Sequence, residues 1–173
     1  FTDFPHNQLK QDTMGQFIPI DVADNFFSIQ RSTEQKPGRK YLGICSPGSS
    51  RPAVLIRVYT ALLTAAQALF DTFGQAADPY MTLVGYFNSL RELGGMRRLT
   101  EDDVRTRSFR VQMSEVFRPG LAQRSIKEPT RELTSRVSNK EIPKTLDQLE
   151  VPFKKNAGKG EEKPIDIVLA TNM

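Results

Sequence analysis

The amino-acid sequence predicts an α/β fold with a mainly parallel sheet flanked by helices. Two nearly continuous apolar runs, residues 80–87 and 165–171, have the length and the branched and aromatic content of strands buried on both faces. Amphipathic helical patterns precede the first run and lie between the two runs. Strands that alternate with helices are typical of a layered α/β domain with parallel strands.

Length and composition set the class of protein. A chain of 173 residues with 38% hydrophobic and 25% charged residues is typical of one globular domain and not of a disordered chain. The net charge of +4 favours polyanionic partners without requiring one. Because the chain starts at Phe1 and ends just after a strand-like run, we expect it to be a piece of a longer protein.

Two residue types are scarce. With one cysteine, Cys45, the chain cannot form an internal disulfide or a zinc site built on several thiolates, so we expect an intracellular, cytoplasmic protein. One histidine, His6, argues against a Ser-His-Asp triad and against a two-histidine metal site. Charged and polar residues interrupt the most apolar stretch, residues 52–73, so no segment has the roughly 18–20 uncharged residues of a membrane span.

The first half of the chain contains three predicted segments. The first is an irregular amino-terminal arm, residues 1–40. The other two begin the domain, which we expect to comprise residues 41–173. A short strand over residues 40–45 ends at Cys45, whose thiol we expect to be buried and unreactive. A helix runs from Ser50, with Ser49 or Ser50 able to cap it, to its stop at Gly74. The residues predicted to line its core face are Val54, Val58, Leu62, Ala65, Ala66, Leu69 and Phe73.

In the second half, each strand leads into a helix. Ser89 and Glu92 have the spacing of a capping box, and they open a helix that should end near Gly94. A further short helix could start near Thr100, whereas residues 109–117 are ambiguous.

The last predicted elements repeat this order. A strand over residues 133–137 is followed by the capping-box spacing of Ser138 and Glu141. The apolar face of the helix that they open consists of Ile142, Leu146 and Leu149. A polar loop over residues 151–163 then leads to the final strand.

Small polar residues follow the predicted strands, where ligands of parallel sheets bind. They are residues 46–50, Asn88 and Ser89, and Thr171 and Asn172. Such side chains suit hydrogen bonds to phosphate oxygens. Serine and asparagine are also common helix caps, and both interpretations remain open at this point.

Three other motifs do not support catalysis. Gly158, Lys159 and Gly160 lack the spacing of a P-loop. The acidic residues 101–103 are better explained as first-turn helix charges than as a metal site. A serine hydrolase using Ser46 or Ser49 would lack the nucleophile elbow.

Arginine is concentrated in the middle of the chain. Its planar guanidinium suits phosphate contacts, but an ordinary solvated face explains the pattern equally well. The residues are Arg91, Arg97, Arg98, Arg105, Arg107, Arg110, Arg118, Arg124, Arg131 and Arg136.

The order of the segments resembles a known family. Residues 82–93, 132–138 and 165–173, in that order after a long helix, resemble the second RecA-like domain of superfamily 2 helicases. More narrowly, they are similar to the helicase of the DISARM anti-phage defence system. The resemblance covers residues 41–173.

This resemblance implies roles for particular residues. Residues 86–89 would be helicase motif IV, residues 133–137 the segment before motif V, and residues 170–172 the start of motif V. In the family such residues contact the nucleic-acid backbone, with caps and core packing as the alternative for each. The implied contacts are Asn88, Ser89, Ser135, Arg136, Thr171 and Asn172.

The resemblance also implies what the chain lacks. The rest of motif V and the arginines of motif VI would follow residue 173, and the Walker lysine and magnesium-binding acid belong to the first RecA-like domain. ATP and Mg would therefore be bound mostly by other parts of the parent protein, whose partners would be single-stranded DNA and other defence subunits. The alternative function is a non-catalytic α/β module that docks a protein partner through Phe17, Phe26 and Phe27.

Overall fold

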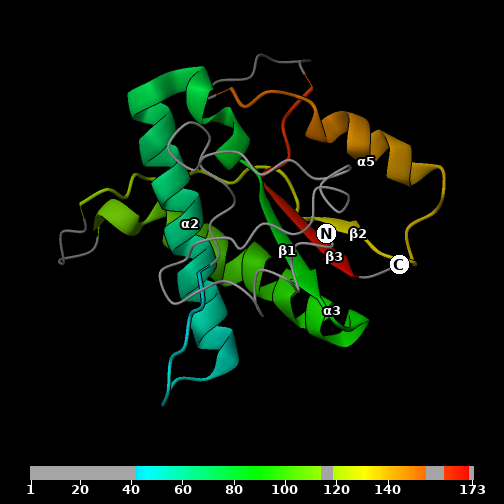
Figure 1. Cartoon of the computed structure of the whole chain (residues 1–173), viewed down its shortest axis with the longest axis horizontal. Coiled ribbons are helices and arrows are strands. Elements are labelled where there is room, and N and C mark those ends of the chain that lie inside the picture. The colour runs from blue at the N-terminus through cyan, green and yellow to red at the C-terminus, as the bar shows by residue number, and fades with distance from the viewer. Residues whose placement is uncertain (1–41, 114–118, 155–161, 172–173) are drawn as a thin grey trace, which may run out of the picture. The chain divides into compact units, whose positions relative to one another are not determined.

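A three-stranded parallel sheet is the central feature of the computed structural model, which describes residues 42–113, 119–154 and 162–171 (Figure 1). The helices and strands of the described residues lie within the unit Ser46–Met173. In chain order they are α2 (Arg51–Phe73), the 3₁₀ helix η2 (Gly74–Tyr80), β1 (Leu83–Phe87), α3 (Leu90–Leu99), the π-helical turn η3 (Thr100–Val104), α4 (Arg105–Phe109), the 3₁₀ turn η4 (Val111–Met113), β2 (Arg131–Leu133), α5 (Glu141–Leu149) and β3 (Ile167–Thr171). The predicted α/β class is confirmed, and the arrangement is consistent with a partial RecA-like domain. The predicted arm, residues 1–40, lies outside the described residues, so the domain boundary stays a prediction.

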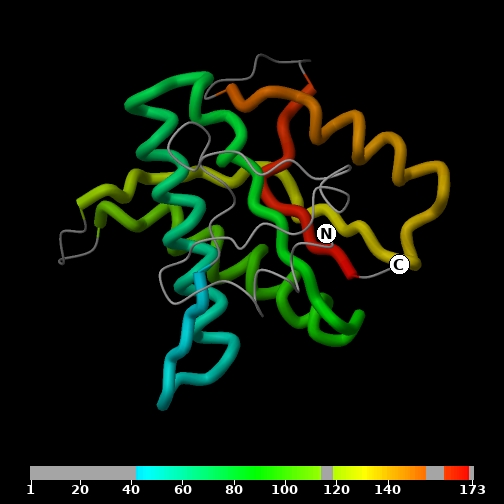
Figure 2. Tube along the Cα trace, viewed as in Figure 1, coloured from blue at the N-terminus to red at the C-terminus, as the bar shows by residue number. Residues whose placement is uncertain are grey.

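The strand order is β1-β3-β2, and both pairings are parallel. The arrows in Figure 1 give the strand directions, and Figure 2 traces the same chain as a tube. The central strand β3 is buried on both faces, because Val168 and Leu169 have no exposed surface. The sequence also predicts that β1 is buried on both faces, and this prediction is wrong. Val84 of β1 is 46% exposed and Tyr86 is 73% exposed. Among the described strands β1 lies at an edge of the sheet, and the side chains of Val84 and Tyr86 remain exposed on it.

Helix α2 has the predicted limits. The Ala53 N–H donates to the capping Ser50 Oγ (3.4 Å), and Gly74 ends the helix at a positive φ of 59°. By length and composition alone, Arg51–Tyr80 is apolar enough to cross a membrane, a property that core helices also have. Here the helix has a core face, and its largest buried apolar side chains are Ile56, Tyr59 and Leu63.

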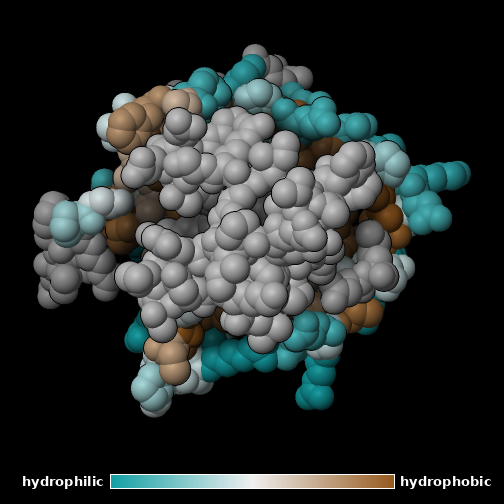
Figure 3. Space-filling model, in the orientation of Figure 1, coloured by the Kyte–Doolittle hydropathy of each residue, from teal (hydrophilic) through white to brown (hydrophobic). Residues whose placement is uncertain are grey.

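The predicted core face of α2 is only partly right: Ala66 is buried and Val58 packs against the core, but three of its larger residues are exposed. Leu62, Leu69 and Phe73 are 52%, 40% and 63% exposed, while the neighbouring positions Tyr59 and Leu63 are buried. Because apolar residues surround most of this helix, its periodicity does not determine which side meets the sheet. Figure 3 shows the resulting mixture of apolar (brown) and polar (teal) residues on the visible described surface.

The core lies between the sheet and the pair α2 and α3. Phe87 of β1 and Leu169 of β3 face Leu63 of α2 and Leu93 and Met96 of α3 in one cluster. Burial of that cluster explains why α3 continues through Gly94 and Gly95, although a stop was predicted there. Packing of an apolar face outweighs the low helix propensity of glycine. The predicted new helix near Thr100 is instead a π-helical turn that joins α3 directly to α4.

Other boundaries differ from the predictions. Residues 42–45 form no strand, and Cys45 is exposed, not buried, because no described strand pairs with this segment. The predicted strand 133–137 is displaced: β2 ends at Leu133, and the next residues turn. The ambiguous segment after Phe109 is the short turn η4 as far as Met113, and residues 114–118 lie outside the described part.

Helix α5 forms as predicted but without the predicted cap. No side-chain hydrogen bond caps it, since the Glu141 N–H donates to the backbone carbonyl of Ser138 (2.9 Å). It lies beyond β2 in Figure 1, with Ile142 and Leu149 half-buried and Leu146 49% exposed. Within the predicted polar loop that follows, residues 155–161 lie outside the described residues.

Candidate nucleic-acid interface

The carboxyl ends of the three strands share one edge of the sheet. Phe87 of β1 is in register with Thr171 of β3, and Leu133 of β2 is in register with Ala170. The predicted contact residues follow these positions, so parallel topology brings segments distant in sequence to one edge. We call this edge, with Asn88, Ser89, Ser135, Arg136 and Thr171, the carboxyl edge.

Asn88 and Ser89 join β1 to α3 and are both exposed. Ser89 is the helix cap that its spacing predicted, because its Oγ accepts a hydrogen bond from the Glu92 N–H (3.3 Å). A serine hydroxyl that accepts this bond still has a proton to donate. Ser89 can therefore cap the helix and at the same time donate a hydrogen bond to a phosphate oxygen.

Ser135 and Arg136 lie in a tight turn after β2. The buried Thr134 holds this turn, since its Oγ accepts from the Arg136 N–H (3.3 Å) and its carbonyl accepts from the Val137 N–H (3.0 Å). Both predicted residues point outward and are exposed. Thr171, the last residue of β3, is half-buried, and the predicted Asn172 lies outside the described residues.

The arginine-rich segment divides into two groups. Several guanidiniums have structural partners: Arg97 joins α3 to β2 through Glu132 (2.8 Å) and also contacts Glu101 (3.3 Å). Hydrogen bonds to these carboxylates raise the pKa of Arg97. Arg105 donates to the Glu128 carbonyl (3.1 Å).

The other group is free for a ligand. Within this segment, the exposed arginines whose side chains have no partner among the described residues are Arg91, Arg98, Arg110 and Arg136. Of these, Arg136 lies on the carboxyl edge, and Arg91 lies in the first turn of α3, which starts there. Arg118 lies outside the described residues.

Arg124 has neither of the two roles that the sequence left open for the arginines, a phosphate contact or a place on a solvated face. It is 1% exposed, and its Nη2 contacts Asp166 Oδ1 (2.5 Å) and donates to the Met81 carbonyl (2.9 Å). Its guanidinium also lies 4.5 Å from the ring centre of Phe153. A phosphate contact by Arg124 is therefore excluded in this fold.

The partner of Arg124 was not identified from the sequence. Asp166 precedes β3, and burial raises the pKa of its carboxyl, which Arg124 partly counteracts. One signal was present: a carboxylate inside an otherwise apolar run needs a buried partner. The identity of that partner, 42 positions away, was not evident.

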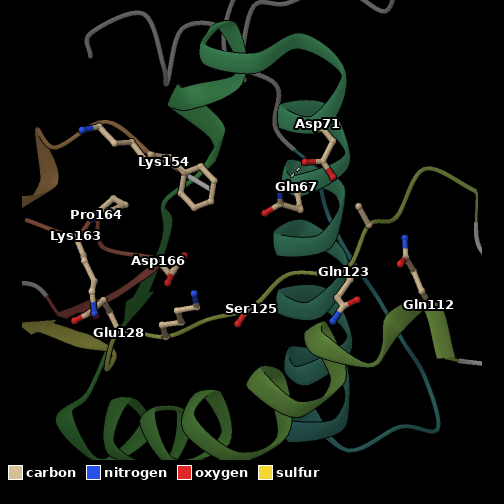
Figure 4. Close-up of a pocket in the computed structure, with 13 residues that line it drawn as sticks. Gln67, Asp71, Gln112, Gln123, Ser125, Glu128, Lys154, Lys163, Pro164 and Asp166 are labelled. Atoms are coloured by element: carbon tan, nitrogen blue, oxygen red, sulfur yellow. Dashed lines mark hydrogen bonds and ion pairs between the residues drawn. The ribbon is translucent and has the colours of Figure 1, made fainter. Parts of the chain in front are cut away.

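A polar pocket of about 470 Å³ opens at the amino-terminal edge of the sheet, opposite the carboxyl edge (Figure 4). Asp166, Glu128 and Lys163 line it, and Lys163 Nζ pairs with Glu128 Oε1 at 2.8 Å. On the α2 wall, Gln67 donates to Asp71 (2.9 Å). Its lysines and carboxylates are mixed, and the described residues contain no group of three or more His, Cys, Asp or Glu side chains that could hold a metal ion.

Comparison with known proteins gives one informative match. No family model matches the chain. Over 162 residues it is 44% identical to "DISARM protein DrmA" of Bacillus paralicheniformis. The chain is similar to part of a DISARM protein. The match covers 91% of this chain but only 14% of the relative, so the chain spans about one seventh of the length of the curated protein that it matches.

Proposed function

We propose that this chain is part of the second RecA-like domain of an ATP-dependent DNA helicase or translocase in phage defence, and that its carboxyl edge contacts the nucleic-acid backbone. One observation carries the proposal: five of the six residues implied by the helicase resemblance lie at or just after the carboxyl ends of parallel strands, at one edge of one sheet. Similarity to a DISARM protein supports the defence role.

The chemistry of the carboxyl edge suits a phosphodiester backbone. Hydroxyl, amide and guanidinium groups at Ser135, Asn88 and Arg136 donate hydrogen bonds to phosphate oxygens without reading base edges. No carboxylate belongs to this set of residues. The proposed partner is single-stranded DNA, and other defence subunits are proposed partners of the parent protein.

ATP and Mg are proposed cofactors of the parent protein and not ligands of this chain alone. Among residues 42–113, 119–154 and 162–171, no group of three or more carboxylate, histidine or cysteine side chains could hold a metal ion.

Replacing Arg136 with alanine should weaken binding of a fluorescent single strand about three- to ten-fold, because one phosphate contact is lost. The slope of log K against log salt should fall by about 0.7 for that contact. Fluorescence anisotropy at several salt concentrations measures both quantities.

Arg110→Ala is the matched control. Arg110 is also exposed and unpaired among the described residues, but it lies at the end of α4 and not on the carboxyl edge. Its replacement should change the affinity less than about two-fold. Equal losses in the two variants, or binding that does not depend on salt, would contradict the proposed interface.

The purified 173-residue chain should not hydrolyse ATP, with or without DNA, because it has no phosphate cradle and no arginine finger. A coupled phosphate-release assay measures this, with an ATPase added to the same buffer as the positive control. DNA-stimulated hydrolysis by the chain would contradict the assignment of ATP binding to other parts of the parent.

The alternative, a non-catalytic interaction module docking through Phe17, Phe26 and Phe27, concerns residues outside the described part. The same anisotropy titration separates the two functions. Salt-dependent binding that Arg136→Ala weakens favours the nucleic-acid interface, and absence of binding favours the interaction module.

A further inference from the structure

A groove of about 580 Å³ lies between the first turns of α2 and the helix α3, and we call it the α2–α3 groove. Its apolar residues are Leu55, Phe87, Met96 and Leu99. Charged residues line the rest of it, with Arg51 and Glu92 at one end and Arg98, Asp102 and Asp103 along α3 and η3. None of the roles proposed above uses this groove.

Glu92 has an unused acceptor in the groove. Its Oε1 pairs with Arg51 Nη1 (2.6 Å), but its Oε2 is buried and accepts no hydrogen bond from the described residues. A buried carboxylate oxygen without a donor is costly and calls for an explanation. A donor brought in by a ligand would provide one.

Gly95 keeps the groove open. It lines the groove in the middle of α3, where glycine is the least favourable residue after proline. Its φ is not positive, and a Cβ built on it would meet no atom within 4 Å, so neither backbone conformation nor internal packing requires glycine. A side chain at this position would enter the groove, and the absence of one permits a ligand to approach the helix closely.

The turn η3 adds a second irregular feature. A π-helical turn follows α3 directly and carries Asp102 and Asp103 to the groove. Such turns are uncommon and frequent at functional sites. Asp102 forms no ion pair with any described residue, and Asp103 has only a long contact with Arg107 (3.9 Å).

We propose that the α2–α3 groove docks a segment of a partner protein that combines large apolar side chains with an arginine or lysine. The apolar side chains would cover Leu55, Met96 and Leu99, and the cation would donate to Glu92 Oε2. Three carboxylates against two guanidiniums favour a basic segment and disfavour a nucleic-acid strand. An amphipathic helix laid in a groove is a common form of such recognition.

This proposal does not depend on the nucleic-acid interface, although the two surfaces are adjacent. Ser89 caps α3 at the carboxyl edge, and Glu92 lies one turn further along the same helix. A protein docked in the groove would thus lie beside the proposed DNA strand.

A peptide selection tests the proposal. Phage-displayed random peptides of about 16 residues are selected on the immobilised 173-residue chain, with counter-selection on the bare support. We expect enriched peptides that combine arginine or lysine with leucine, phenylalanine or methionine. Their affinities are then measured by fluorescence anisotropy on each variant.

Gly94→Leu is the matched control, because Gly94 is equally exposed and helical but does not line the groove. Gly95→Leu should weaken the enriched peptides at least about ten-fold, and Gly94→Leu less than about two-fold. Glu92→Gln should weaken them about five-fold, since it removes the charge and keeps the shape. Both leucine variants should melt at or above the wild-type temperature, which separates occlusion from unfolding.

Several results would overturn the proposal. They are no enrichment, enrichment of acidic peptides, affinities that Gly95→Leu does not change, and a loss of single-stranded DNA binding in Gly95→Leu but not in Gly94→Leu. A wild-type dimer that Gly95→Leu dissociates would also overturn it, because the groove would then bind a second copy of the chain.

Discussion

Replacing Arg124 with methionine should lower the free energy of unfolding by about 3–5 kcal/mol, because it leaves the Asp166 carboxylate buried without its partner. Methionine keeps most of the unbranched stem, so little packing is lost. The guanidinium also donates to the Met81 carbonyl and lies over the ring of Phe153. It therefore connects the residues just before β1 and β3 with the segment that follows α5. All these contacts are lost together.

Urea denaturation followed by circular dichroism measures this effect. Lys163→Met is the control, because it breaks a pair in which Lys163 is 49% exposed, and it should cost less than about 1 kcal/mol. The double variant Arg124→Met with Asp166→Leu should recover most of the loss, since no buried charge remains. An Arg124→Met chain within about 1 kcal/mol of wild type would show that the pair contributes little.

The loss in Arg124→Met should depend on pH. Burial holds the pKa of Asp166 above its ordinary value of 3.8, and removing Arg124 takes away a contribution that lowers it. A carboxyl whose pKa is raised on folding stabilises the folded state most at acid pH, and this contribution is lost as the pH rises through the folded pKa. The deficit of Arg124→Met should thus be largest at neutral pH and shrink on acidification toward 3.8.

Much of the fold follows from local patterns in the sequence. The caps Ser50 and Ser89, the stop at Gly74 and the apolar run that forms β3 depend on neighbouring residues alone. The carboxyl edge could also be predicted, because alternating strands and helices imply parallel strands, and parallel strands place the residues that follow them together.

Features that depend on distant contacts could not be predicted. Leu62 and Leu63 are chemically identical neighbours, yet only Leu63 is buried, because the sheet meets one side of an almost uniformly apolar helix. Arg124 is indistinguishable in sequence from the exposed Arg136, and its burial depends on Asp166 and Phe153. The α2–α3 groove could not be predicted either, because it exists only where two helices lie side by side in the folded chain.

The second large effect concerns Gly85, at the centre of β1. A Cβ at this position would lie within van der Waals contact of Leu169 Cδ2 and Tyr59 Cζ, both 3.1 Å away, and it would overlap Tyr59 Oη. Tyr59 is buried in the core, and its burial raises its pKa to about 12. Gly85→Ala should therefore lower the free energy of unfolding by about 1–3 kcal/mol, because either the backbone of β1 or the ring of Tyr59 must move in a close-packed interior.

Tyr59→Phe should partly rescue Gly85→Ala, since it deletes the oxygen that a Cβ would overlap. We expect the double variant to be more stable than the sum of the two single changes by at least about 0.5 kcal/mol, as measured by urea denaturation. Gly94→Ala is the control, because an added Cβ there meets nothing within 4 Å, and it should be neutral or stabilising. Additive effects of Gly85→Ala and Tyr59→Phe on the free energy of unfolding would show that the Tyr59 hydroxyl does not pack against Gly85 as described.

The same substitution connects core packing with the proposed interface. Asn88 and Ser89 follow β1 directly, so a shift of β1 away from Tyr59 would move them relative to Thr171 and Arg136. At a temperature where both chains are folded, Gly85→Ala should thus bind single-stranded DNA more weakly than wild type, and Tyr59→Phe should restore part of that affinity. Rescue of stability without rescue of affinity would mean that the register of β1 with β3 does not position the nucleic-acid contacts.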